Sequence, residues 1–398
     1  MSAGWTLDAV CLQIVDCEHK TAPIDESGAY FAVGTPAMRD GVIDYSQARR
    51  ISRDTFEKWT HRMRPEVGDL LFAREAPVGP IVRIPREENV APGQRTVLLR
   101  PDSSRVSSDF LFYLLSSPLQ QRRLQERAYG STVPHLNVAD VRAFQLPQLP
   151  GLPAQQAIAE ILGALDNKIA ANRKLARVAD ALAHAIFRTI AHGASDRAVA
   201  YGDIANVGGG GTPKTSVPEY WGGSIPWATP TDVTALDVPS LGETARSITE
   251  QGLANSSANL YPAGSILMTS RATIGAFAIA ERPLAVNQGF IVVNAKDPVF
   301  QWWLYHDMRS RVDEFVAHAN GATFLELPRG RFKTLTVHVP EVAVIEEFSA
   351  QAAGLHEVAS AASGETRTLA TLRDTLLPRL MSGELRVKDA EAVVADAV

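Results

Sequence analysis

The chain repeats itself, and this internal duplication limits what it can fold into. The segment QLPGLPAQQAIAEILGAL at 148–165 resembles HVPEVAVIEEFSAQAAGL at 338–355, at an offset of about 190 residues. The same offset continues without a gap to Gly193 and Gly383, which are suited to end helices. We therefore expect two copies of one unit, each a mixed block followed by a long helix.

The blocks that precede the two helices also match, with small shifts in spacing. GDLLFAREAPVG at 68–79 resembles GSILMTSRATIG at 264–275, and each begins at a glycine and continues into residues that favour strands. The runs IVRIP, TVLLRP, FAIAE and FIVVNA indicate further short strands. Amphipathic helices are predicted at 107–128 and 300–319. The expected fold class is α+β: two mixed α/β domains with an internal pseudo-two-fold repeat, joined by two long helices.

Heptad spacing dominates both long helices. Apolar residues recur every seven residues from Ile158 in the first helix and from Phe348 in the second. Five heptads form a rod of about 55 Å at ~1.5 Å per residue, which is longer than a small domain needs, so we expect the helices to pair as a coiled coil. The alternative is that each helix packs only on its own domain. The predicted seam consists of Ile158, Leu165, Asn172, Leu175, Leu182 and Ile186, with Phe348, Leu355, Leu369, Leu372 and Leu376.

Composition excludes several classes of protein. The 398 residues are 45% hydrophobic and 21% charged, as in soluble globular domains. Because the only two cysteines, Cys11 and Cys17, lie close together, no disulfide framework or cysteine zinc site is expected. No secretion signal opens the sequence and no apolar run reaches the ~18 residues of a membrane span, so we expect a cytoplasmic protein. The net charge of −5 arises in residues 341–398, and it therefore does not decide whether either block has a basic face.

The most distinctive local stretch is GGGGTPKTSVPEYWGGSIPWATPTDV at 208–233. It is not a Walker A loop, because Pro213 rather than glycine precedes Lys214. The sequence also lacks a dinucleotide-binding fingerprint, a zinc-protease motif, a nucleophile elbow and any cluster with metal-ligand spacing. We therefore expect a binding protein with no catalytic residues, cofactor or metal of its own.

DNA binding accounts for the residue types of this stretch. Small hydroxyl, aromatic and basic side chains on a glycine-rich loop are able to approach phosphates and base edges closely. The alternative for Trp221 and Trp227 is packing on the core beneath the loop, and for Arg74 and Arg271 it is a salt bridge at a strand end. The loops YGSTV and NGATF are first of all turns. The candidate DNA contacts are Thr212, Lys214, Thr215, Tyr220, Trp221, Trp227, Thr229, Arg271 and Thr323 in the second block, and Arg74, Ser131 and Thr132 in the first.

With these residues assembled, nearly the whole chain resembles the specificity subunit of type I restriction–modification systems. GGTPKTSVPEYWGGSIPWATPTDV is similar to the opening of that family's second target-recognition domain. LPAQQAIAEILGALDNKIAANRKL is similar to the first conserved helix, and EEFSAQAAGLHEVASAASGETRTLATLRDTLLPRLMSGEL to the second. The resemblance implies target-recognition domains at 1–150 and 194–340, conserved spacer helices at 151–193 and 341–385 that form an antiparallel coiled coil, and a tail at 386–398.

The resemblance also implies a function. Each domain would read one half of a split, asymmetric DNA site, while the helix pair sets the spacing and docks two methyltransferase subunits that carry S-adenosylmethionine. Restriction and translocase subunits using ATP and Mg would complete a complex that is an adenine-specific DNA methyltransferase and a type I site-specific deoxyribonuclease. Two other functions stay open. One is a protein–protein scaffold without a DNA role, and the other is carbohydrate binding through Trp221 and Trp227.

Overall fold

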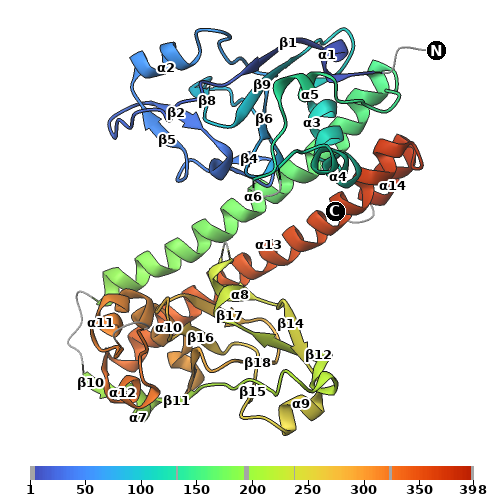
Figure 1. Ribbon diagram of the computed structural model, residues 1–398. Coiled ribbons are helices and arrows are strands. Elements are labelled where there is room, and N and C mark those ends of the chain that lie inside the picture. The colour runs from blue at the N-terminus through green and yellow to red at the C-terminus, as the bar shows by residue number, and fades with distance from the viewer. Residues whose placement is uncertain (1–4, 131–132, 192–196, 237, 322–324, 396–398) are drawn as a thin grey trace. The chain divides into compact units, whose positions relative to one another are not determined.

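The computed structural model divides the chain into two compact units. Unit 1 contains residues 1–167 and 369–398, and unit 2 contains residues 168–368. The division falls within the two long helices, so each of them contributes residues to both units. Figure 1 labels the elements of each unit. The structure describes residues 5–130, 133–191, 197–236, 238–321 and 325–395.

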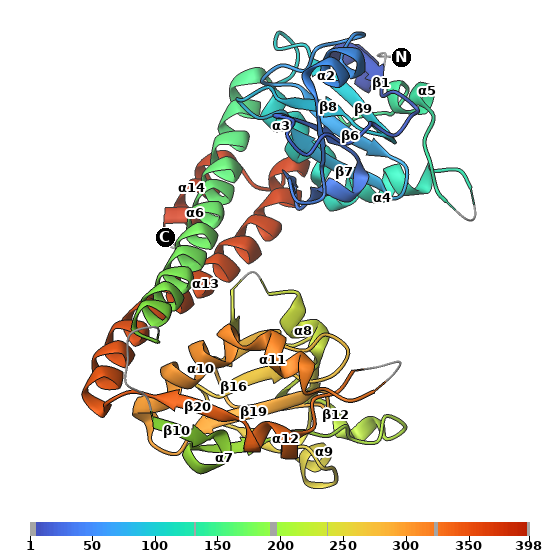
Figure 2. The ribbon, with the colours of Figure 1, turned by 90° about the vertical axis from the view of Figure 1, so that its left-hand side faces the viewer.

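Unit 1 contains two sheets and a hairpin. The larger sheet has four antiparallel strands in the order β1-β9-β6-β7, and the smaller sheet has the order β5-β2-β8 with β2 and β8 parallel. Helices α3 and α4 pack against β7 (Figure 2). The elements are α1 (Leu7–Val10), β1 (Cys11–Asp16), β2 (Tyr30–Val33), η1 (Thr35–Ala37), β3 (Met38–Arg39), β4 (Val42–Ile43), β5 (Arg49–Ile51), α2 (Arg53–Trp59), β6 (Leu70–Arg74), β7 (Val78–Arg83), β8 (Val90–Pro92), β9 (Thr96–Pro101), α3 (Ser108–Ser116), α4 (Pro118–Glu126), α5 (Val138–Arg142) and the first part of α6 (Leu152–Ala191).

Unit 2 contains a five-stranded sheet in the order β11-β19-β16-β17-β13 and a four-stranded sheet in the order β14-β12-β18-β15. Strands β10 and β20 form a separate antiparallel pair. The elements are β10 (Arg197–Ala200), α7 (Tyr201–Ile204), β11 (Ala205–Gly208), η2 (Pro218–Tyr220), β12 (Trp221–Ala228), α8 (Pro230–Thr234), β13 (Ser240–Leu241), β14 (Arg246–Ile248), α9 (Glu250–Ala254), β15 (Leu260–Tyr261), β16 (Ile266–Thr269), β17 (Phe277–Ala280), β18 (Leu284–Val286), β19 (Phe290–Ala295), η3 (Pro298–Phe300), α10 (Gln301–Ser310), α11 (Val312–Ala317), α12 (Arg329–Thr334), β20 (Thr336–Val339) and the first part of α13 (Val342–Ser382).

The two units share one strand skeleton. Strands β1, β9, β6 and β7 of unit 1 have the order and pairing of β11, β19, β16 and β17 in unit 2, and β5-β2-β8 match β14-β12-β18. The registers agree too, since Leu70 lies opposite Leu99 and Ile266 lies opposite Val293. The predicted duplication is therefore present in the backbone as well as in the sequence.

The two predicted amphipathic helices are each broken into a pair. The segment 107–128 contains α3 and α4, and the segment 300–319 contains α10 and α11, so the prediction of one helix in each place was wrong. Pro118 begins α4, where its missing N–H is no loss because the first residues of a helix have no intrahelical acceptor. In unit 2 the break falls at Arg311, whose φ of −121° lies outside the helical range.

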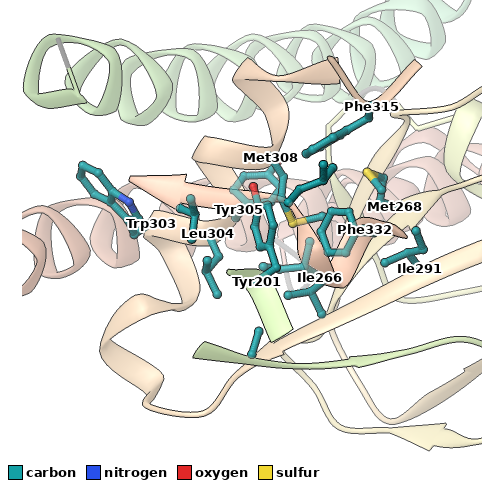
Figure 3. Packing of buried hydrophobic residues seen from close by; sticks show 14 of the residues in the cluster. Tyr201, Ile266, Met268, Ile291, Trp303, Leu304, Tyr305, Met308, Phe315 and Phe332 are labelled. Carbon is teal, nitrogen blue, oxygen red and sulfur yellow. The ribbon is translucent and has the colours of Figure 1, made fainter. Parts of the chain in front are cut away.

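The core of unit 2 lies between the five-stranded sheet and α10. Ile266 and Ile291 on the sheet belong to the same buried cluster as Trp303 and Leu304 on α10 (Figure 3). Tyr201 is fully buried in this cluster, and its hydroxyl donates a hydrogen bond to the Asp307 carboxylate. Burial raises the pKa of Tyr201 well above its ordinary value, so the phenol stays neutral.

The long helices α6 and α13 pair antiparallel within unit 2. Asn172 Nδ2 donates to Glu365 Oε2 at 2.7 Å near one end of this part of α6, and Phe187 packs on Phe348 with ring centroids 5.8 Å apart near its other end. Between these contacts, small alanines of both helices form one buried cluster made up of Ala176, Ala179, Ala359 and Ala362. The coiled-coil pairing predicted from the heptads is therefore present there.

The predicted seam needs one correction. Leu175 and Leu182 are 48% and 49% exposed, whereas Ala176 and Ala183 beside them are buried. The second stripe of α6 therefore lies one residue later than predicted, at alanines whose small side chains let the helices approach closely. The other predicted positions are buried at Ile158, Leu165, Asn172, Phe348, Leu369 and Leu376 and half-buried at Ile186, Leu355 and Leu372.

Two remaining features concern the end of the chain and the membrane. The segment 386–398, predicted as a tail, contains the helix α14 (Val387–Ala395), whose Ala390 is buried. Its alanines and valines recur at helical spacing, which explains the helix. Within the described part of the chain, no helix is both long and apolar enough to cross a membrane.

Candidate nucleic-acid interface

Two tryptophans of unit 2 hold the glycine-rich stretch from beneath. Trp227 Nε1 donates to the Gly211 carbonyl at 3.0 Å, and Trp221 Nε1 donates to the Lys214 carbonyl at 3.3 Å. Their rings meet edge to face with centroids 5.1 Å apart. Trp227 is only 4% exposed, so the alternative of packing on the core is correct for it, and it is removed from the candidate DNA contacts. Trp221 is half-buried.

The hydroxyl residues and the lysine of this stretch differ in exposure and in hydrogen bonding. Lys214 and Thr215 are exposed, and Tyr220 is half-buried. Thr212 Oγ1 donates to Gln288 Oε1 at 2.6 Å. Thr229 closes the first turn of α8 in a reciprocal capping box with Asp232, so its hydroxyl serves the fold.

An arginine that was not predicted completes this surface. The Arg246 guanidinium lies over the Trp221 ring, 3.5 Å from its centroid, and the side chain is exposed. Stacking on an indole holds the planar guanidinium in place while leaving its N–H groups free to donate. The sequence carried a signal for it, because ARRIS at 48–52 and ARSIT at 245–249 are a further pair of repeats.

The arginines predicted at the strand ends occupy different environments. Arg74 is buried, with Nε 3.3 Å from Asp16 Oδ1 and Nη1 donating to the Leu136 carbonyl. These contacts stabilise the interior of unit 1, so Arg74 is removed from the candidate DNA contacts. Arg271 is 44% exposed at its side chain and pairs with Glu326 at 2.9 Å. Ser131, Thr132 and Thr323 lie outside the described residues.

Arg74 and Arg271 do not occupy equivalent positions in the two units. Isolated bridges join Glu75 to His135 in unit 1 and Arg271 to Glu326 in unit 2, at matching places in the two skeletons. Glu75 therefore stands where unit 2 has Arg271, and it pairs with Arg95 at 3.3 Å. The charge at this strand end is reversed between the two units.

A buried polar cluster lies under α10 in unit 2. His306 Nε2 is 3.0 Å from His356 Nε2, and His306 Nδ1 is 3.3 Å from His184 Nδ1. Asp180 accepts two hydrogen bonds from Arg309 beside them, at 2.8 and 2.9 Å. Burial, with His356, Arg309 and His184 nearby, lowers the pKa of His306 to about 2, and burial lowers the pKa of His356 to about 4. These two imidazoles are therefore neutral at physiological pH.

The chemistry available in these residues is that of binding. Among the described residues, no group of three or more His, Cys, Asp or Glu side chains is arranged to hold a metal. The histidines pack on aromatic rings in the interior, as in the stack of His356 on Trp302 with centroids 4.0 Å apart. The exposed Lys214 and Arg246 beside Trp221, by contrast, are of the types that bind nucleic acids, because cations contact phosphates and aromatic rings stack on bases.

Comparison with known proteins identifies the family. The model of the type I restriction modification DNA specificity domain matches twice, at residues 22–178 and 198–347. The MjaIX specificity subunit, a type I restriction enzyme subunit of Methanocaldococcus jannaschii, is 40% identical over 140 residues, which are 35% of this chain and 32% of that protein. The EcoR124I/EcoR124II specificity subunit of Escherichia coli is 29% identical over 148 residues, which are 35% of this chain and 36% of that protein. The chain thus spans about a third of the length of these relatives.

A solved structure extends the likeness to the fold of the whole chain. The S subunit of a type I restriction-modification system from M. genitalium covers 95% of both chains with a TM-score of 0.60, at 18% sequence identity. Together the two family matches cover well over half of the residues. The chain therefore belongs to the type I restriction modification DNA specificity family and carries that domain twice.

Proposed function

We propose that the chain is the specificity subunit of a type I restriction–modification complex, in which each recognition domain reads one half of a split, asymmetric DNA site. The observation that carries the proposal is the double match to the DNA specificity domain. The two units share a strand skeleton but differ in the side chains at matching positions, such as Glu75 and Arg271. Two similar modules with different contacting residues are suited to two unlike half-sites.

The long helices α6 and α13 have two roles in this proposal. They extend over 40 and 41 residues and contribute to both units, so their length sets the spacing between the half-sites. They also dock two methyltransferase subunits, with restriction and translocase subunits joining for cleavage. In this proposal the chain consists of two recognition domains and two spacer helices. The recognition domains are residues 1–150 and 194–340, and the helices are residues 151–193 and 341–385.

Catalysis in this proposal belongs to the partners. The methyltransferase subunits bind S-adenosylmethionine and flip an adenine out of the duplex for methylation, and the restriction subunits use ATP and Mg for cleavage. This chain supplies double-stranded DNA recognition and needs no cofactor. The complex acts in the cytoplasm on DNA that carries its site. The family match disfavours a scaffold without a DNA role and a carbohydrate-binding protein.

The proposal is tested by mapping adenine methylation in the host genome with and without the gene. Loss of methylation at one split, asymmetric motif is the expected result, because the partner methyltransferases depend on this chain for their target. Restoring the gene should restore the motif. Retention of every methylated motif in the deletion strain, together with failure of the purified chain to bind a methyltransferase, would contradict the proposal.

A further inference from the structure

Unit 1 contains a polar cavity at the edge of its smaller sheet. The cavity has a volume of about 400 Å³ and lies between β2, β5 and the turn after β8. Its floor is formed by Ala32 on β2 and by the backbone of Gly34 and Gly93. The polar side chains in its wall are Thr21, Gln47, Arg49, Gln94 and Arg95.

Hydrogen-bond donors dominate this wall. Thr21 Oγ1 donates to Gln94 Oε1 at 3.3 Å, and this bond orients the Gln94 amide and leaves its N–H groups able to donate. Arg49 is exposed, and its side chain makes no hydrogen bond or ion pair to another residue in the described part of the chain. Arg95 pairs with Glu75 at 3.3 Å. A ligand of this cavity is therefore expected to present acceptors.

Unit 2 fills the equivalent position with a tryptophan. In unit 1, Ala32 lies beside Ala91 on the parallel strand and opposite Arg49 on the antiparallel strand. In unit 2, Trp227 has the same two kinds of neighbour, Ala285 and Arg246. Side chains at the same register of matching strands point to the same face.

The tryptophan changes how the neighbouring arginine is held. In unit 2 the Trp227 ring reaches the glycine-rich stretch and donates to Gly211, and Arg246 lies over Trp221. The pair of Thr212 and Gln288 repeats the pair of Thr21 and Gln94. The threonine–glutamine pair and the arginine are thus common to both units. The open cavity of unit 1 lies at the position that Trp227 fills in unit 2.

We propose that this cavity is where the first recognition domain reads one base of its half-site, and that the base is a guanine contacted by Arg49. The inference rests on the proposed function. Guanine presents two acceptors, O6 and N7, on its major-groove edge, and the two N–H groups of a guanidinium match them. Gln94 adds a donor beside Arg49, so the cavity suits guanine better than adenine or cytosine, whose edges present an amino group.

A phosphate is the other source of acceptor oxygens in DNA. A phosphate contact contributes affinity without regard to sequence, whereas a base contact changes the preference at one position. The conservative variant Arg49→Lys separates the two, because lysine keeps the positive charge but lacks the planar fork that bonds guanine at two points. The variant Ala32→Trp fills the cavity as unit 2 does and leaves Arg49 in place.

The experiment uses the complex of the full chain with its methyltransferase subunits and a duplex library randomised at both half-sites. Methylated molecules are sequenced, and the overall yield and the preference at every position are compared among wild type, Arg49→Ala, Arg49→Lys and Ala32→Trp. Arg246→Ala is the matched control, since this arginine occupies the same register in unit 2. We expect both unit 1 variants to reduce the guanine preference at one position of one half-site by roughly tenfold or more, with the other half-site and the spacer unchanged.

Other outcomes overturn the inference in distinguishable ways. A weakening by Arg49→Ala that is equal for all sequences and is restored by Arg49→Lys would assign Arg49 to a phosphate. An unchanged preference in Arg49→Lys, whose exposed side chain does not affect folding, would remove the cavity from base reading even where Ala32→Trp fails to fold. A wild-type complex that methylates without any two-part preference would overturn the proposed function and the inference together.

Discussion

The two units build the same junction between a recognition domain and the long helices from different chemistry. In unit 1, the Tyr113 hydroxyl of α3 donates to Asp166 of α6 at 2.6 Å, and Asp166 also accepts from Arg373 of α13 at 2.8 Å. In unit 2, His306 of α10 contacts His356 of α13 and His184 of α6. Asp166 and His356 are related by the same offset of about 190 residues that relates the two helices.

The comparison shows that the repeat conserves where the polar contact is made and not which groups make it. The charges of unit 1 are partly exposed, with 29% and 27% of the Asp166 and Arg373 side chains accessible. The imidazoles of His306 and His356 are buried and neutral. The partly exposed ion pair of unit 1 tolerates contact with water. The buried histidines of unit 2 must instead stay unprotonated, because a buried charge is unfavourable.

The largest expected difference follows from pH. Because the folded pKa values of His306 and His356, about 2 and about 4, lie below the ordinary 6.5, the unfolded chain binds more protons as pH falls below 6.5. Unit 2 is therefore fully stabilised above pH 6.5. It loses up to about 1.4 kcal/mol per pH unit for each histidine on acidification, until about pH 4 for His356 and about pH 2 for His306.

Amide hydrogen exchange measures this loss locally, with rates corrected for the intrinsic effect of pH. We expect α10 of unit 2 to lose protection between pH 6.5 and 4.5 while α3 of unit 1 keeps it. The variant His306→Leu should flatten the response of α10, since it removes one of the buried bases. Equal loss of protection in α3 and α10 would show that the histidines do not set the acid sensitivity.

Trp227→Ala is expected to have the next largest effect. It would make the smaller sheet of unit 2 resemble that of unit 1, where Ala32 occupies the equivalent position. Because Trp227 is buried and its indole also holds Gly211, we expect a loss of about 3–5 kcal/mol in the free energy of unfolding. Urea denaturation of the full chain measures it. Trp221→Ala, at a half-buried tryptophan, is the control. If Trp227→Ala lowered the free energy of unfolding no more than this control, the surrounding residues would have closed the space that the Trp227 ring leaves.

Removal of a carboxylate at each junction sharpens the comparison further. Asp180→Ala leaves Arg309 without its bidentate partner in a largely buried place, and we expect a loss of about 3 kcal/mol. Asp166→Ala breaks a more exposed contact with Arg373, so about 1 kcal/mol is expected. The midpoints of urea unfolding for the two variants provide the test. Equal shifts would indicate that water reaches Asp180 as readily as Asp166.

The smallest expected effect is that of Lys214→Ala on DNA binding, which rests on the proposed function. An exposed lysine that contacts one phosphate contributes to affinity for all sequences, so we expect a several-fold weakening and a decrease of about 1 in the salt slope. A titration of the full complex with a duplex at several salt concentrations measures both. Thr215→Ala in the same loop should leave the slope unchanged, and an unchanged slope in Lys214→Ala would remove this lysine from the interface.

Local patterns were enough to predict much of the fold. GDLLFAR and GSILMTSR contain the strands β6 and β16, and the two long heptad segments are the helices α6 and α13. These predictions depend on periodicities of two and of three to four residues, which follow from backbone geometry alone. The breaks at Pro118 and Arg311 were missed because amphipathic spacing continues across them.

The candidate interface was predicted less completely, for a physical reason. Arg74 and Arg246 are the same residue type at strand positions, yet one is buried against Asp16 and the other is stacked at the surface on Trp221. What separates them is the set of neighbours that arrive from distant parts of the chain. A pattern of residue types along one segment does not contain that information.

Duplication, strand periodicity and heptad spacing are patterns of the sequence alone, so they were sufficient to predict a duplicated α+β protein with two long heptad helices. The tertiary structure was needed to show which stripe of α6 is buried, at Ala176 and Ala183 instead of Leu175 and Leu182. It also showed that the position held by Ala32 in unit 1 lines an open cavity, whereas the equivalent position in unit 2 is filled by the buried Trp227. Both outcomes depend on how closely separate segments approach each other, and side-chain volume across a contact sets that distance.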